Sequence, residues 1–153
     1  MKTNEKTAEV LNDLVRINND RVEGYERASK ETESKDADLR AIFTNMANES
    51  RGYAGELSKY ITRTGEETAD GTTFSGKIYR AWMDVKATFS GNDRKAILAS
   101  CEFGEDAAQR AYDAALASDA DLPAEVRQLI MEQKTKLRKS HDRIKQMRDT
   151  QPA

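Results

Sequence analysis

Residues 65–91, GEETADGTTFSGKIYRAWMDVKATFSG, decide the fold of this chain because they join two long helical segments. The stretch begins as a polar loop, and the spacing then predicts a short helix over about residues 76–89. The apolar stripe of that helix is Ile78, Trp82, Val85 and Phe89. A connection of about 27 residues can run back along a whole bundle, which would leave the helices before and after it parallel.

Four long segments flank this connection, each with apolar residues at helical spacing. The periodicity predicts helices over about residues 4–32, 36–64, 92–118 and 123–149. The other two connections are short, so the first and second helices, and the third and fourth, should be antiparallel neighbours. We therefore predict one all-α domain over residues 1–153, a ferritin-like four-helix bundle with a long crossover between helices two and three. Asp36 is the expected cap of the second helix, and Gly65 the expected left-handed residue after it.

The composition suits long amphipathic helices. Hydrophobic residues make up 37% and charged residues 34% of the chain, so each helix can bury one stripe and solvate the rest. The net charge of −2 argues against nucleic acid or an acidic membrane surface as a partner. The single cysteine, Cys101, excludes an intramolecular disulfide. No apolar run has the length of a transmembrane span or the form of a signal peptide, so we expect a cytoplasmic protein.

Six short sequence motifs together make a resemblance to one protein family specific. They are LNDL at 11–14, NDRVEGYE at 19–26, YRAW at 79–82, GNDRKAIL at 91–98, CEFGED at 101–106 and HDRI at 141–144. Through them nearly the whole chain resembles a bacterial family of ferritin-like four-helix-bundle proteins described only as a domain of unknown function. The resemblance implies the fold and supplies no activity. Because ferritin-like proteins more widely bind iron or manganese, it also raises the hypothesis of a metal site.

The complete di-metal motif of ferritin-like proteins is absent from this sequence. That motif takes a glutamate from each of two helices and Glu-x-x-His from each of the other two. The chain has one histidine, His141, and Arg138 stands three residues before it. Glu49 is followed by Gly52 where a histidine would be needed.

A partial site is still compatible with the helical periodicity. A helical wheel places Glu105 about 40° from the centre of its apolar stripe and His141 about 60° from its own. Glu102 and Glu49 fall at the flanks. The candidate metal ligands are therefore Glu102, Glu105, His141 and Glu49, a carboxylate-rich set that favours iron or manganese. Counting helical turns puts Asn18, Glu49, Ser50 and Glu105 at nearly one level, with Arg21, Tyr25, Glu102 and His141 within about two turns of them.

A structural polar core explains the same convergence without a metal. Arg21 also faces inward, and a buried arginine among Glu49 and Glu105 would form an internal ion pair and oppose a bound cation. This core would comprise Asn18, Arg21, Tyr25, Tyr53 and Gln133 together with the carboxylates. If Arg21 points into the centre and pairs with Glu105, the metal hypothesis is nearly excluded.

Two functional hypotheses follow, and the residues specify a reaction for neither. The first is a non-enzymatic, cytoplasmic binding or stress-associated protein that forms a small homo-oligomer. The second is a degenerate ferritin-like protein that binds iron or manganese. An adaptor that recognises a helix in a surface groove is a third alternative, without a sequence signal of its own.

Overall fold

The computed structural model describes residues 2–32, 36–66, 68–69 and 94–150. Four α-helices account for most of them, α1 (Lys2–Glu31), α2 (Ala37–Arg63), α4 (Arg94–Ala117) and α5 (Ala124–Asp149), and this part of the chain contains no strand. The bounds lie close to the ranges expected from periodicity. The crossover helix expected at about 76–89 lies outside the described residues.

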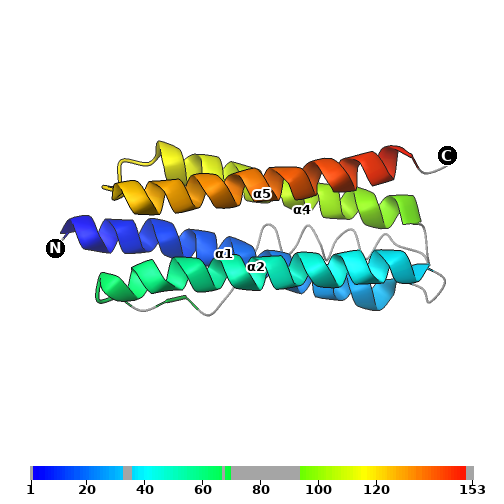
Figure 1. Ribbon diagram of the computed structural model, residues 1–153, viewed down its shortest axis with the longest axis horizontal. Helices are drawn as coiled ribbons and strands as arrows, with labels where there is room; N and C mark the ends of the chain where they lie inside the picture. Colours follow the sequence, from blue (N-terminus) through cyan, green and yellow to red (C-terminus); the bar gives the residue numbers. More distant parts are fainter. Residues whose placement is uncertain (1, 33–35, 67, 70–93, 151–153) are drawn as a thin grey trace.

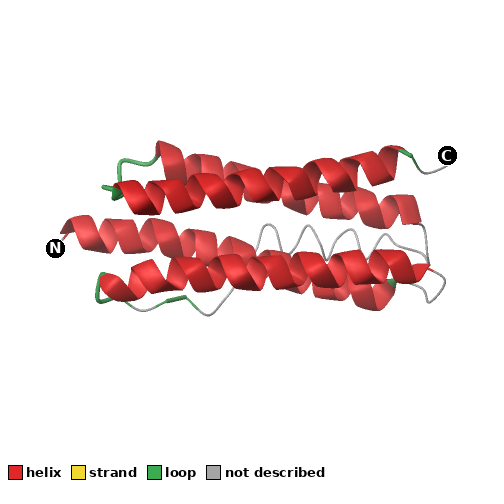
Figure 2. Ribbon diagram, viewed as in Figure 1, coloured by secondary structure: helices red, strands yellow, loops and turns green. Residues whose placement is uncertain are grey.

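The four helices lie side by side along the long axis of the molecule (Figures 1 and 2). α1 and α2 form one antiparallel hairpin and α4 and α5 form another, while α2 and α4 run in the same direction (Figure 1). The two hairpins meet mainly where α1 packs against α4, and α2 and α5 touch least. This is the arrangement predicted for a bundle with a long crossover between its second and third helices.

The apolar stripes of all four helices meet in one core. Among its fully buried members are Leu11, Leu14, Leu39, Phe43, Leu57, Ile61, Leu98, Ile130, Leu137 and Ile144. Each such side chain contributes about 1.5–3 kcal/mol relative to an exposed one. Cys101 is also fully buried, and burial first, with the Glu105 carboxylate adding to it, raises the pKa of its thiol well above the ordinary value. It therefore behaves as a small apolar residue. None of the described helices combines the length and the apolar character needed to cross a membrane.

The ends of α2 show one confirmed and one wrong expectation. Gly65 follows the helix with a φ of +86°, the left-handed conformation that glycine adopts without strain. Asp36 stands at the N-cap position, but its side chain makes no capping hydrogen bond. Its carboxylate instead accepts a hydrogen bond of 3.0 Å from Nη1 of Arg94, the first residue of α4. The Asp36 carboxylate therefore binds a guanidinium of α4, where we expected it to cap α2.

Candidate functional site

A buried ion pair occupies the centre of the bundle. Arg21 on α1 and Glu105 on α4 are 2% and 0% exposed, and Arg21 Nε donates to Glu105 Oε1 over 2.6 Å. Both residues lie on the apolar stripes of helices that pack against each other, so neither charge can reach water. Burial alone would lower the pKa of Arg21, but the carboxylate of Glu105, with Tyr25 and Glu49, raises it above its ordinary value. The guanidinium is therefore a fixed cation.

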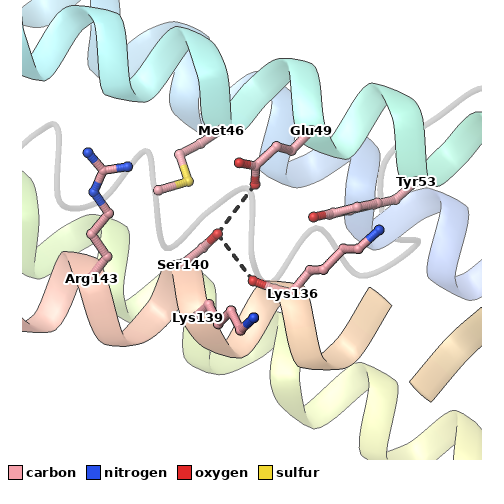
Figure 3. Close-up of a pocket in the computed structure, with 7 residues that line it drawn as sticks. All are labelled: Met46, Glu49, Tyr53, Lys136, Lys139, Ser140 and Arg143. Atoms are coloured by element: carbon pink, nitrogen blue, oxygen red, sulfur yellow. Dashed lines mark hydrogen bonds between the residues drawn. The ribbon is translucent and has the colours of Figure 1, made fainter. Parts of the chain in front are cut away.

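α2 provides hydrogen-bond acceptors for the other side of the Arg21 guanidinium. Arg21 Nη1 donates to Ser50 Oγ at 2.7 Å and to the backbone oxygen of Met46 at 3.2 Å. Glu49 lies at the edge of the bundle, with its Oε2 3.9 Å from Arg21 Nη2. The same oxygen accepts a hydrogen bond of 3.3 Å from Ser140 on α5 (Figure 3). Arg21 thus ties α1 to both α2 and α4.

Tyr25 completes the environment of Glu105. Its hydroxyl donates to Glu105 Oε1 at 2.5 Å, and the Arg21 guanidinium lies 5.1 Å from the centre of its ring. Burial, followed by the adjacent Glu105 carboxylate, raises the pKa of Tyr25 well above its ordinary value. The phenol is therefore a permanent donor to the carboxylate.

A second polar chain crosses the bundle and involves all four helices. Asn18 on α1 donates to the hydroxyl of Tyr112 on α4 at 2.8 Å. That hydroxyl donates in turn to Gln133 Oε1 on α5 at 2.6 Å. Gln133 Nε2 reaches α2, where the backbone oxygen of Tyr53 accepts at 3.1 Å. Asn18, Tyr53 and Gln133 were expected to face inward, and all three are buried.

A separate cluster lies between α4 and α5, where Glu102, Asp106 and His141 each bring a possible metal-ligating atom within 4.8 Å of the others. His141 Nε2 is 2.6 Å from Asp106 Oδ1, and its Nδ1 is 3.0 Å from Asp142 Oδ1. A carboxylate on the second ring nitrogen is the usual way in which a ligating histidine is oriented. Arg148, near the end of α5, forms an ion pair with Glu102.

The residues at the centre do not fit the di-metal site of ferritin-like proteins. Oε2 of Glu105 is buried without a hydrogen-bond partner in the described chain, which by itself would suit a ligand. However, Oε1 is already bound by Arg21 and Tyr25, and a guanidinium stands where cations would have to be. The only histidine of the sequence faces Asp106 rather than Glu105. We therefore derive no metal chemistry at the centre.

The structure divides the four candidate ligands expected from the sequence. Glu102 and His141 come together, Glu105 is held by Arg21, and Glu49 lies beside the α2–α5 edge. Sequence reasoning missed Asp106. The available signal was its position four residues after Glu102, which puts both carboxylates on one face of a helix.

The position of Asn18 along the bundle axis differs from the expected one. Asn18 was expected level with Glu105, but it bonds Tyr112, whereas Arg21 is the α1 residue that reaches Glu105. Side chains on a helix lean toward its N-terminus. Because α1 and α4 are antiparallel, their side chains lean in opposite directions, and the contacts shift by about one turn from a count along the axes.

Comparison with known proteins agrees with this arrangement. A solved structure of a Dps1 mutant from Mycobacterium smegmatis, a ferritin-like four-helix bundle, superposes with a TM-score of 0.80 at 17% identity. The match covers 95% of this chain and 97% of that one, and it shows the fold. No curated protein matches the chain. The family model described as Domain of unknown function (DUF2383) matches residues 6–118, so the chain belongs to that family.

Proposed function

We propose that this chain is a non-enzymatic binding protein whose bundle centre is structural. The observation that supports this most directly is the hydrogen bond from Arg21 Nε to Glu105 Oε1. It neutralises the Glu105 carboxylate and puts a fixed positive charge at the centre of the bundle. Buried charge of this kind sets helix register and needs no ligand.

The same proposal includes a cytoplasmic location and a small homo-oligomer. Two large apolar side chains on the outer surface support self-association: Phe103 on α4 is 54% exposed and Met131 on α5 is 53% exposed. Size-exclusion chromatography with light scattering would measure the assembly, and a monomer at cellular concentrations would contradict it. The ferritin-like fold makes stress survival the first setting in which to look for a phenotype.

A second candidate function is binding of one divalent cation by Glu102, Asp106 and His141. The observation that favours it is the convergence of two carboxylates and an imidazole whose other nitrogen faces Asp142. Two carboxylates and one histidine suit iron or manganese. The cation would have to displace the Arg148 ion pair from Glu102 and the Asp106–His141 contact.

Metal retention distinguishes these possibilities. The protein, purified without a metal-affinity step, would be incubated with ferrous iron or manganese, desalted and analysed by elemental mass spectrometry. The informative variants are Glu105→Gln for the centre and Asp106→Asn and His141→Ala for the cluster. Asp113→Asn is the matched control, since it removes an α4 carboxylate two turns further on, where it pairs with Lys134.

Each outcome assigns the function differently. No retention supports the structural centre and removes the second candidate. Near-stoichiometric retention that is lost in Asp106→Asn and His141→Ala, and kept in Glu105→Gln and Asp113→Asn, establishes the α4–α5 site. Retention that is lost only in Glu105→Gln would contradict our proposal, because it would place the metal at the centre.

A further inference from the structure

An open cleft lies between α2 and α5, where the two hairpins touch least. Its volume is about 490 Å³, which is within the range of small-molecule sites. The lining comes from three residues of α2 and four of α5: Met46, Glu49, Tyr53, Lys136, Lys139, Ser140 and Arg143. Arg143 and Lys136 extend from α5 toward α2 on either side of Ser140, and Tyr53 extends from α2 into the space between (Figure 3).

The charge of this cleft is strongly biased. Lys136, Lys139 and Arg143 stand at positions i, i+3 and i+7 of α5, so they share one face of the helix. None of the three has an ion-pair partner within the described residues. Most other basic residues of α5 do: Lys134 pairs with Asp113, and Arg138 with Asp142. Three cations without counter-ions on one wall repel one another, and an anion would relieve that repulsion.

The carboxylate in the lining offsets only one of these three charges. Glu49 accepts a hydrogen bond from Ser140 and lies 3.9 Å from Nη2 of Arg21, whose own charge is already paired with Glu105, so the lining keeps a net positive charge. The cleft also offers a neutral donor. The hydroxyl of Tyr53 has no hydrogen-bond partner in the described chain, and the residue as a whole is 7% exposed. Met46 adds an apolar side chain to the lining.

We propose that the α2–α5 cleft binds a small organic polyanion through Lys136, Lys139 and Arg143. The chemical class is a phosphate ester or a polycarboxylate, since both present several charged acceptor oxygens to ammonium and guanidinium donors. Tyr53 would donate to the same anion, and its ring and Met46 would contact the carbon skeleton. This inference gives a ligand to the binding role proposed above and depends on that role alone, not on whether a metal binds at α4–α5.

Calorimetric titration of the full chain with pyrophosphate and, separately, with citrate tests the proposal and distinguishes the two sources of negative charge. We expect saturable binding of at least one probe that weakens as the salt concentration rises. Lys136→Gln combined with Arg143→Gln should weaken that binding by about tenfold or more, because two charge-assisted contacts are lost. Glu49→Gln should strengthen it, since a like charge is removed from the lining.

The matched control is Lys145→Gln, which removes the same charge from the opposite face of α5, outside the cleft. Circular dichroism would confirm that each variant is folded. Absence of binding for both probes would overturn the inference. So would equal weakening by Lys145→Gln and by either cleft substitution alone, because that pattern indicates non-specific attraction to a basic helix. Neither result would bear on the structural centre, which metal retention tests independently.

Discussion

Arg21 has more polar partners than any other fully buried side chain described above. Its guanidinium contacts Glu105 on α4 and Ser50 and Met46 on α2. Removing a charge of this kind from the interior leaves the opposite charge buried without compensation. Replacing both partners by neutral groups removes the penalty as well as the attraction.

Arg21→Met should therefore destabilise the protein by about 3–5 kcal/mol, because the Glu105 carboxyl group is left buried without its counter-charge. The double variant Arg21→Met with Glu105→Gln should recover most of that loss. Urea denaturation of the wild type and the single and double variants gives the coupling free energy directly. If the double variant loses as much free energy of unfolding as the two single variants together, the coupling free energy is zero. The interaction between Arg21 and Glu105 would then contribute nothing to stability.

At the scale of the helices, Tyr112 is the central link of the polar chain from α1 to α5. Tyr112→Phe removes both the acceptor of Asn18 and the donor to Gln133. We expect a loss of about 1–3 kcal/mol in the free energy of unfolding, since two buried polar groups lose a partner. Tyr60→Phe is the control, a partly buried α2 tyrosine whose hydroxyl makes no hydrogen bond in the described chain. Equal effects of the two substitutions would show that the chain of bonds adds nothing.

The starts of α2 and α4 are joined by Arg94, which pairs with Asp36 and with Asp38. The hydrogen bond from Arg94 lowers the pKa of Asp38 below its ordinary value of 3.8. A carboxyl group whose pKa is lower in the folded protein stabilises the fold at pH values above its pKa in the unfolded chain. This stabilisation is lost as the pH falls through the pKa of the folded protein. Carbon-detected NMR titration should show Asp38 returning to its ordinary pKa in Arg94→Gln. An unchanged titration curve would show that a group other than Arg94 lowers the pKa of Asp38.

At the scale of the whole molecule, the tyrosines make stability sensitive to alkali. Burial, with Glu49 adding to it, raises the pKa of Tyr53 to about 12 from 10.0. The unfolded chain therefore loses this proton first as the pH rises, so the contribution of neutral Tyr53 is complete below pH 10 and is lost as the pH passes through 12.

Between those pH values, the free energy of unfolding should fall more steeply in the wild type than in Tyr53→Phe. The difference in slope is at most about 1.4 kcal/mol per pH unit, the value for one proton. Urea unfolding at a series of alkaline pH values measures both slopes. Parallel slopes would mean that the phenol is as well solvated in the folded protein as in the unfolded chain.

Helical periodicity was sufficient to place Glu105, Arg21 and Gln133 inside, because a period of 3.6 residues defines a face over many turns. It could not pair Asn18 with Tyr112, since that depends on how antiparallel side chains lean. Asp106 escaped prediction because its contact with His141 depends on the rotation of α5 against α4. The failure at Asp36 has a related cause: Arg94 lies 58 residues away in sequence and is adjacent only in the folded chain.

The two halves of the central ion pair belong to different hairpins, Arg21 to α1–α2 and Glu105 to α4–α5. Before the hairpins dock, α4–α5 would carry the Glu105 carboxylate on an otherwise apolar face without Arg21 and Tyr25, whereas Arg21 already has Ser50 and Glu49 on α2. The opposite signs also make the halves selective for each other. Two copies of the α1–α2 hairpin packed together would bring two guanidinium groups into one dry interior. The ion pair therefore favours docking of the two unlike hairpins over self-pairing of either one.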